Sequence, residues 1–246
     1  MEDMPGKPWP EDFPEVIKIS KSEEMKAHTD YEMAKSGNRD AAARLVLDIL
    51  RDKVSLACIY KIAVKYPDAI IVPVHEEEQR GRNQIPRALA DFIALYTGLE
   101  ADTGIVQTKK IGRTGAGQWA RMAFRPKFDG PVIPGRKYIL VDDVITMGGT
   151  LSELRQHIET NGGKVVDIAT LGAARNSTII ALNDKIKLEL ERRYGVDSLR
   201  KFLREAGLYG GNYEALTKSE ARAILDAGTL DEAGNRIIAA RQPGGA

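Results

Sequence analysis

The chain has 246 residues, enough for one or two ordinary domains with a sizeable buried core. Its 43% hydrophobic and 29% charged residues are typical of a folded globular protein and exclude a largely disordered chain. The net charge of +1 provides no overall attraction to nucleic acid, and no segment reaches the apolar length of a membrane span.

The numbers of cysteines and histidines and the N-terminal sequence further limit the kinds of protein and site that are expected. The single cysteine, Cys58, cannot form an internal disulfide, which favours a reducing compartment and a cytoplasmic location. The three histidines are far apart in the sequence, so a multi-histidine metal site is not expected. Four prolines within residues 1–15 predict an extended arm and not a signal peptide.

The first half of the chain changes from helices to a strand. Residues 22–66 carry apolar residues at helical spacing and are predicted to form three helices that end before Pro67. The apolar run 69–74 predicts a buried parallel strand, and a helix over 84–96 follows it.

The second half continues this alternation. A weak strand over 104–107 leads into a long predicted loop over 108–130, and the clearest strand covers 137–142. A helix over 151–160 and a strand over 164–171 follow. Alternating strands and helices predict an α/β fold with a mostly parallel sheet flanked by helices.

The same patterns suggest three regions. Residues 1–68 form an N-terminal arm with helices, residues 69–176 form the α/β core, and residues 177–246 form a C-terminal helical extension. We expect the core to carry the functional site, because ligands of open α/β sheets bind at the carboxyl ends of the strands.

One motif at such a strand end carries the chemistry. The strand YILV is followed by Asp142 and Asp143, by the loop 146–150 (TMGGT) and by a helix. Gly148 and Gly149 allow close approach of a ligand, and the amides at the helix N-terminus favour a phosphate. Carboxylates repel phosphate, so sugar hydroxyls are their natural partners. The motif therefore predicts a sugar-phosphate site, and it lacks the Gly-Lys-Ser/Thr ending of a Walker A loop.

The segment VDDVITMGGT resembles the phosphoribosyl-pyrophosphate (PRPP) loop of type I phosphoribosyltransferases, in its orotate-type and competence protein F-like forms. The resemblance implies a Rossmann-like core in which Asp142 and Asp143 hold the ribose hydroxyls and contact Mg²⁺ through PRPP. The family usually has a second hydroxyl residue where Met147 stands, although the backbone amide remains available. The other PRPP-binding residues implied in this loop are Val144, Ile145, Thr146, Met147, Gly148, Gly149 and Thr150.

Simpler interpretations of this motif exist. The sequence from Thr150 to Glu153 matches a helix capping box, which would explain Thr150 without a ligand. Two aspartates at a strand end can also form a solvated turn.

A second stretch, HEEEQRGRNQ at 75–84, is similar to the RGxNQ sequence of competence protein F-like phosphoribosyltransferases. The resemblance implies that this loop meets the pyrophosphate of PRPP, with Glu76–Glu78 pointing mostly away because carboxylates repel it. His75 by itself is more typical of a loop histidine than of a catalytic group. The pyrophosphate-side residues implied are His75, Glu76, Arg80 and Arg82.

The segment 103–128 contains six basic side chains, several glycines and no acidic residue. In the family, a loop at this place closes over the site, and a basic lid would stabilise the leaving pyrophosphate and exclude water. A solvated charged loop and a nucleic-acid patch with Trp119 for stacking are the alternatives. The candidate lid residues are Lys109, Lys110 and Arg113 as catalytic groups and Arg121 as a PRPP ligand.

The resemblance implies transfer of phosphoribosyl from PRPP to a nitrogen acceptor, with Mg²⁺ bound through PRPP and release of pyrophosphate. Thr146 stands where 6-oxopurine enzymes have an aspartate, which disfavours hypoxanthine, guanine and xanthine as acceptors. The alternative is a non-catalytic PRPP or nucleotide sensor whose helical extensions engage a protein or nucleic-acid partner.

The C-terminal extension has its own patterns. Apolar residues recur at helical spacing from Ile179 to Leu190, and Thr217 with Glu220 forms a predicted capping box. The extension can either cover the core or form an interface. We expect the helix over 177–194 to lie at a homodimer contact, since phosphoribosyltransferases commonly pair.

Overall fold

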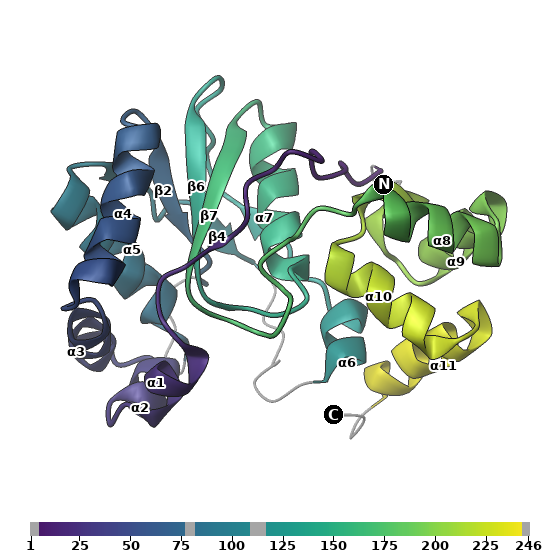
Figure 1. The fold of residues 1–246 in the computed structure, drawn as a ribbon, viewed down its shortest axis with the longest axis horizontal. Helices are drawn as coiled ribbons and strands as arrows, with labels where there is room; N and C mark the ends of the chain where they lie inside the picture. The colour runs from purple at the N-terminus through teal and green to yellow at the C-terminus, as the bar shows by residue number, and fades with distance from the viewer. Residues whose placement is uncertain (1–4, 77–81, 109–116, 243–246) are drawn as a thin grey trace.

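The computed structural model describes residues 5–76, 82–108 and 117–242, and its centre is a five-stranded parallel sheet (Figure 1). The strand order is β1-β7-β6-β2-β3, and all four pairings are parallel. The α/β fold with a parallel sheet is therefore confirmed. The strands are β1 Ile17–Lys18, β2 Ile70–Pro73, β3 Glu100–Ala101, β6 Lys137–Ile145 and β7 Lys164–Ala173, and a separate antiparallel pair consists of β4 Val106–Gln107 and β5 Phe128–Asp129.

The central strand β6 is buried on both faces, which explains its nearly continuous apolar sequence. Ile139 and Val141 pack into one apolar cluster, and the alternate residues Tyr138 and Leu140 pack into another on the opposite face. Helices from the first 97 residues cover the first face, and α7 covers the second (Figure 1). These helices are α1 Ser22–Ala27, α2 Tyr31–Lys35, α3 Arg39–Ile49, α4 Lys53–Lys65, α5 Ile85–Thr97 and α7 Gly149–Thr160.

The N-terminal arm is extended as predicted, but it is bound to the body of the protein. Trp9 is 5% exposed, and its indole N–H donates to the hydroxyl of Ser152 on α7 at 3.0 Å. The Arg155 guanidinium lies 4.4 Å from the Trp9 ring centre. The arm then forms β1, which pairs with β7 at the edge of the sheet. Nothing in the local sequence predicts this two-residue strand, because its partner Ala169 lies 152 positions after Ile17 (169 minus 17).

The C-terminal extension forms a third apolar cluster on the far side of α7 (Figure 1). It includes Met122 from the segment predicted to be a loop, because residues 118–123 form helix α6, which packs against α11. Trp119 lies within this contact, beneath the Arg236 guanidinium at 5.6 Å, so its ring already has a partner within the chain. The elements are α6 Gln118–Ala123, α8 Asp184–Tyr194, α9 Val196–Glu205, α10 Lys218–Ala227, α11 Leu230–Arg241 and the 3₁₀ turns Tyr209–Gly211 and Tyr213–Ala215.

The apolar face of the helix predicted over 177–194 does not form the expected homodimer contact, because it packs within the chain itself. The helix begins only at Asp184, and its apolar residues Ile186 and Leu190 are 3% and 0% exposed within the chain's own C-terminal cluster. Side chains already buried in this way are not available to a second copy. Of the helices in the described ranges, none combines the length and the apolar character that crossing a membrane requires.

Two leucines of α8 test this assignment. Leu190→Glu should lower the free energy of unfolding by at least about 3 kcal/mol, because it removes buried apolar contacts and places a charge in the cluster. Leu188→Glu is the matched control: Leu188 is 66% exposed, so we expect a change within about 0.5 kcal/mol. Denaturant unfolding measures both values. A folded, equally stable Leu190→Glu protein of halved mass would instead restore the dimer contact.

Candidate functional site

The two carboxylates of the PRPP-like motif lie near the carboxyl end of β6 and have different partners. Asp143 is 8% exposed, and its Oδ2 accepts hydrogen bonds from Lys35 Nζ at 2.8 Å and from Asn83 Nδ2 at 2.9 Å. Its Oδ1 accepts from the backbone N–H of Val144 at 2.7 Å. Asp142 accepts from the backbone N–H of Asp143 at 2.8 Å. The solvated-turn interpretation is therefore wrong, because Asp143 is bound by two other elements.

These partners give the two carboxyl groups opposite pKa shifts. Burial by itself would raise the pKa of Asp143, but the charge and hydrogen bond of Lys35, together with Asn83, hold this pKa below its usual range. Burial raises the pKa of Asp142 well above its usual range, and the neighbouring charge of Asp143 raises it further. At neutral pH Asp143 is thus the stably charged member, and Asp142 is the one that gains most from a hydrogen-bond donor or a cation.

The phosphate-type loop follows directly. Ile145 ends β6, Gly148 adopts the left-handed φ of +79°, and α7 begins at Gly149. The capping-box alternative is wrong, because Gly148 is the N-cap and Thr150 lies inside the first turn. The side chains of Val144 and Ile145 pack into apolar clusters on opposite faces of the sheet, so only their backbone can meet a ligand.

A buried ion cluster lies beside this loop and was missed by sequence reasoning. The Arg125 side chain is 7% exposed and binds Glu153 at 3.1 Å and Glu220 at 2.5 Å. Its guanidinium lies 4.2 Å from the ring centre of Tyr209, and a side chain at Gly149 would collide with it. Glu153 is thus a partner of Arg125 and not part of a capping box. In the sequence, Arg125 is only one of the six basic residues of the segment 103–128, and nothing near it indicates burial.

The predicted pyrophosphate side is only partly described. The two ring nitrogens of His75 lie 2.9 Å from the carbonyl of Thr103 and 3.2 Å from that of Glu76, and a neutral ring donates to one of them. Burial lowers the pKa of His75, as expected for a loop histidine. Glu76 pairs with Arg82 at 3.0 Å and accepts from Gln107 at 3.1 Å, whereas Glu77 and Glu78 lie outside the described ranges. The positive charge of Arg82 is therefore already balanced within the chain.

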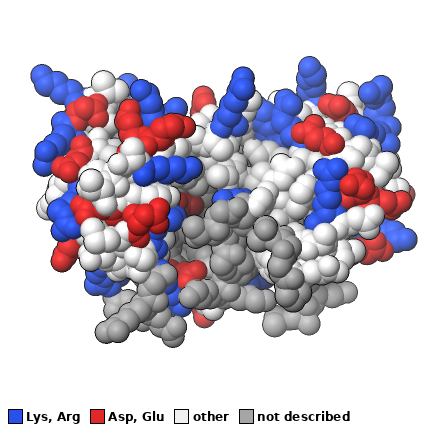
Figure 2. Space-filling view, turned by 90° about the horizontal axis from the view of Figure 1, so that it is seen from below, with Lys and Arg blue, Asp and Glu red and all other residues white. Residues whose placement is uncertain are grey.

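Several predicted residues lie outside the described ranges, namely Arg80, Lys109, Lys110 and Arg113. Arg121 lies half-buried on α6 beside the C-terminal helices. On both sides of the face in Figure 2, Lys and Arg are interspersed with Asp and Glu, so the visible described residues form no continuous basic surface there. This mixture does not favour the nucleic-acid interpretation.

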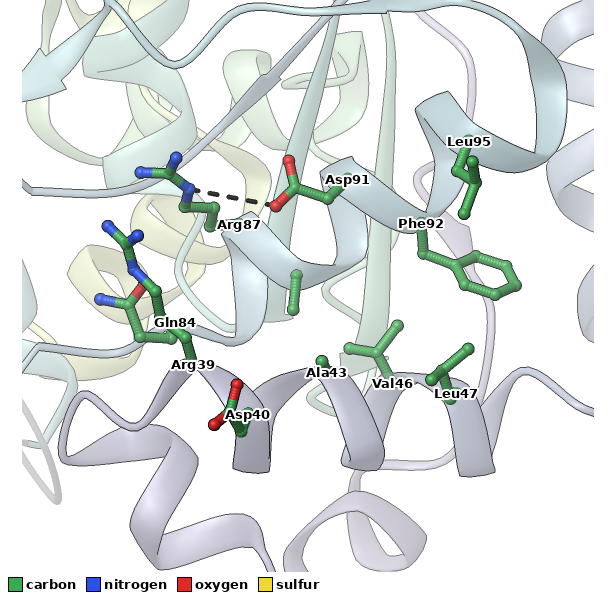
Figure 3. A pocket seen from close by; sticks show the side chains of 11 residues that line it. Arg39, Asp40, Ala43, Val46, Leu47, Gln84, Arg87, Asp91, Phe92 and Leu95 are labelled. Carbon is green, nitrogen blue, oxygen red and sulfur yellow. Dashed lines mark ion pairs between the residues drawn. The ribbon is translucent and has the colours of Figure 1, made fainter.

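A pocket of about 350 Å³ lies elsewhere, between α3 and α5. Figure 3 shows its apolar side chains, Leu47, Phe92 and Leu95, next to the ion pair of Arg87 with Asp91. Neither the acid pair nor the phosphate-type loop lines it. Among the described residues, no group of three or more His, Cys, Asp and Glu side chains is arranged to hold a metal ion.

Residues 88–195 match the family described as "Phosphoribosyl transferase domain". The chain contains a phosphoribosyltransferase domain. The match begins on α5, includes the acid pair and the phosphate-type loop, and ends just after α8. The family resemblance carried by VDDVITMGGT is therefore confirmed.

The chain is also similar to individual proteins. It is 38% identical to Protein TraN of Escherichia coli over 234 residues, which is 95% of this chain and 51% of TraN. It is 40% identical over 60 residues to the adenine phosphoribosyltransferase of Desulforamulus reducens, which is 24% of this chain and 32% of that protein. A structure of adenine phosphoribosyltransferase from Leishmania donovani aligns with a TM-score of 0.35 and 14% identity, over 66% of this chain and 65% of that one.

These comparisons limit what the family assignment says. The chain spans about half the length of TraN, and neither of the two similar sequences is named as a competence protein. They support the phosphoribosyltransferase domain and not the competence protein F-like branch.

The different partners of the acid pair predict opposite effects of two similar substitutions. Asp142→Asn should raise the melting temperature of the ligand-free protein, because it removes a buried charge that lies beside another carboxylate. Asp143→Asn should lower the free energy of unfolding by about 1–3 kcal/mol, because Lys35 then lacks its counter-charge. Thermal and denaturant unfolding without ligand measure both effects. Equal shifts of the same sign would contradict the assignment of Asp143 as the charged member.

Proposed function

We propose that the acid pair and the adjoining loop bind PRPP and that the protein transfers its phosphoribosyl group to a nitrogen acceptor. The observation that carries the proposal is the Asp142–Asp143 pair, half-buried and buried respectively, directly before a glycine-containing helix N-terminus within the matched domain. In this reaction the acceptor nitrogen bonds to C1 of the ribose. The C1–O bond breaks, pyrophosphate leaves with the electron pair, and the acceptor nitrogen loses its proton.

The carboxylates suit the ribose for a chemical reason. Each accepts hydrogen bonds and donates none when ionised, and the ribose 2′- and 3′-hydroxyls are donors. Negative charge near the ring also favours the positive character that develops at C1 as pyrophosphate departs. Asp142, which has no cationic partner as close as that of Asp143, gains more from such donors.

Mg²⁺ fits this site as an ion that arrives with PRPP. Two adjacent carboxylates are too few for a protein-only magnesium site, but the ion commonly keeps several waters and takes its other ligands from phosphates. Asp142 and Asp143 would supply the protein contacts. Bound there, the ion would neutralise charge on the pyrophosphate.

The acceptor is less constrained. Thr146 cannot act as a carboxylate base, so we propose that a nucleobase other than a 6-oxopurine, or a related nitrogen compound, is the acceptor. A second candidate function is a non-catalytic PRPP or nucleotide sensor, and a specific observation supports it: side chains of the C-terminal extension contact the phosphate-type loop directly.

Calorimetric titration with PRPP and Mg²⁺ tests the binding of PRPP, which the enzyme and the sensor have in common. Asp142→Asn and Asp143→Asn should each weaken PRPP binding by roughly 1.5–3 kcal/mol, about tenfold or more in affinity, through loss of charge-assisted hydrogen bonds. Folding of both variants is checked by circular dichroism. Pyrophosphate release across a panel of nitrogen bases then separates the enzyme from the sensor, and a parent protein that does not bind PRPP would contradict both.

The Lys35–Asp143 pair predicts the pH dependence of PRPP binding. PRPP needs ionised Asp143, and Lys35 lowers the pKa of this group, so protonation of Asp143 should weaken binding in the parent only at acidic pH, below the step caused by the raised pKa of Asp142. Lys35→Met removes that effect and leaves burial to raise the pKa. This loss of affinity should therefore begin at a higher pH in the variant.

Lys65→Met is the matched control, since Lys65 pairs at 3.7 Å with Asp167, another buried aspartate of the sheet, away from the motif. Its pH profile for PRPP binding should match that of the parent. Identical profiles for Lys35→Met and the parent would remove Lys35 from the site.

A further inference from the structure

The C-terminal extension contacts the backbone of the phosphate-type loop. The hydroxyl of Thr217, the N-cap of α10, donates to the carbonyl of Met147 at 2.6 Å. The carbonyl of Ile145, just before the loop, accepts from the backbone N–H of Ala174 at 2.8 Å. The hydroxyl of Ser177 lies between this carbonyl, at 3.0 Å, and that of Ala174, at 2.8 Å. Ser177 and Thr217 are 3% and 0% exposed, so these contacts are shielded from water. Two alternate carbonyls, one just before the loop and one within it, are thus fixed by residues that follow the loop in the chain.

This arrangement determines where the loop amides point. The described residues contain no cis peptide bond, and in a trans peptide the C=O of one residue and the N–H of the next point in opposite directions. The carbonyl of Ile145 faces Ala174 and Ser177 after β7, and the carbonyl of Met147 faces Thr217. The N–H groups of Thr146 and Gly148 therefore point away from these partners. N–H groups at this strand-to-helix junction are the donors that a phosphate needs.

Side-chain packing supports the same arrangement. A Cβ at Gly148 would lie 3.1 Å from Ile180 and 3.2 Å from Thr217, so the extension fits closely against the loop backbone. Met147, which replaces the hydroxyl residue usual in the family, packs against the C-terminal apolar cluster. Its side chain therefore anchors the loop to the extension.

Thr217 is itself held in place. It forms the predicted capping box with Glu220, which accepts from the Thr217 N–H at 3.0 Å. The same carboxylate binds Tyr209 at 2.7 Å and Arg125 beside the start of α7. Through Glu220 and Arg125, Thr217 is thus connected to Glu153 on α7, the helix that follows the loop.

We infer that Thr217 is a positioning residue for the 5-phosphate of PRPP and that the C-terminal extension is an integral part of the phosphate site. The inference rests on the proposed function and deepens it. Thr217 acts through the loop backbone and does not touch the ligand. By linkage, binding of a phosphate monoester in the loop should in turn stabilise α10.

Three variants test this role. Thr217→Val should weaken binding of PRPP with Mg²⁺, and of ribose 5-phosphate, about fivefold to tenfold, while binding of inorganic pyrophosphate stays at the parent value. Thr217→Ser keeps the hydroxyl and should restore affinity. Thr229→Val is the matched control, because Thr229 is the N-cap of α11 and accepts from Glu232 N–H at 3.1 Å, so it loses an equivalent cap.

The possible outcomes distinguish failure of the Thr217 inference from failure of the proposed PRPP binding. If the parent binds PRPP and Thr217→Val binds it equally well, the inference is wrong and the proposed function stands. If Thr217→Val loses affinity for pyrophosphate to the same extent, the effect is not specific to the 5-phosphate, and the inference is also wrong. A parent that binds neither PRPP nor ribose 5-phosphate overturns the proposed function itself.

A measurement on the parent protein covers the case in which Thr217→Val does not fold. Ribose 5-phosphate should slow amide hydrogen exchange in α10, which holds Thr217, more than in α4, which lies on the opposite face of the sheet. Equal effects on the two helices, or none on α10, would contradict the coupling.

Discussion

Two neighbouring carboxylates in a buried strand end repel each other, and the arrangement of the site follows from how this repulsion is relieved. Among the residues that the structure describes, a cation pairs with one of the two carboxylates: Lys35 binds Asp143, and Asn83 donates to the same oxygen. Asp142 is left with its neighbour's backbone N–H. The raised pKa of Asp142 means that a hydrogen-bond donor or a cation near it would be stabilising. Stability of the free protein and affinity for a ligand are therefore opposed at this residue.

The same constraint explains why the site draws on distant parts of the chain. Residues that alternate along β6 must fill two apolar layers, so the strand itself supplies no cation for its terminal carboxylates. Lys35 comes from α2, before the matched domain, and Asn83 from the turn before α5. On the other side of the loop, Arg125 brings its charge only because Glu153 and Glu220 balance it in a buried position.

Sequence reasoning identified the features that depend on local pattern. Short stretches of neighbouring residues predict the strand at 137–142, the acid pair and the capping box of Thr217. The structure confirms where these features lie. Features fixed by distant contacts were missed. The six-residue helix α6 is held by α11, and a loop was predicted in its place. Lys35 is one basic residue among 36, and nothing near it in sequence indicates that it pairs with Asp143.

The functional unit is accordingly larger than the segment that matches the family. The match ends at residue 195, yet the carbonyl of Met147 is held by Thr217, and Glu220 joins α10 to the start of α7. A loop that binds phosphate through backbone N–H groups depends on backbone orientation more than on side-chain identity. Met147 can therefore replace a hydroxyl residue when its side chain serves as an anchor to the C-terminal helices. If the loop binds phosphate as proposed, those helices are part of the binding site, and a partner bound to them would act on the phosphate loop through Thr217.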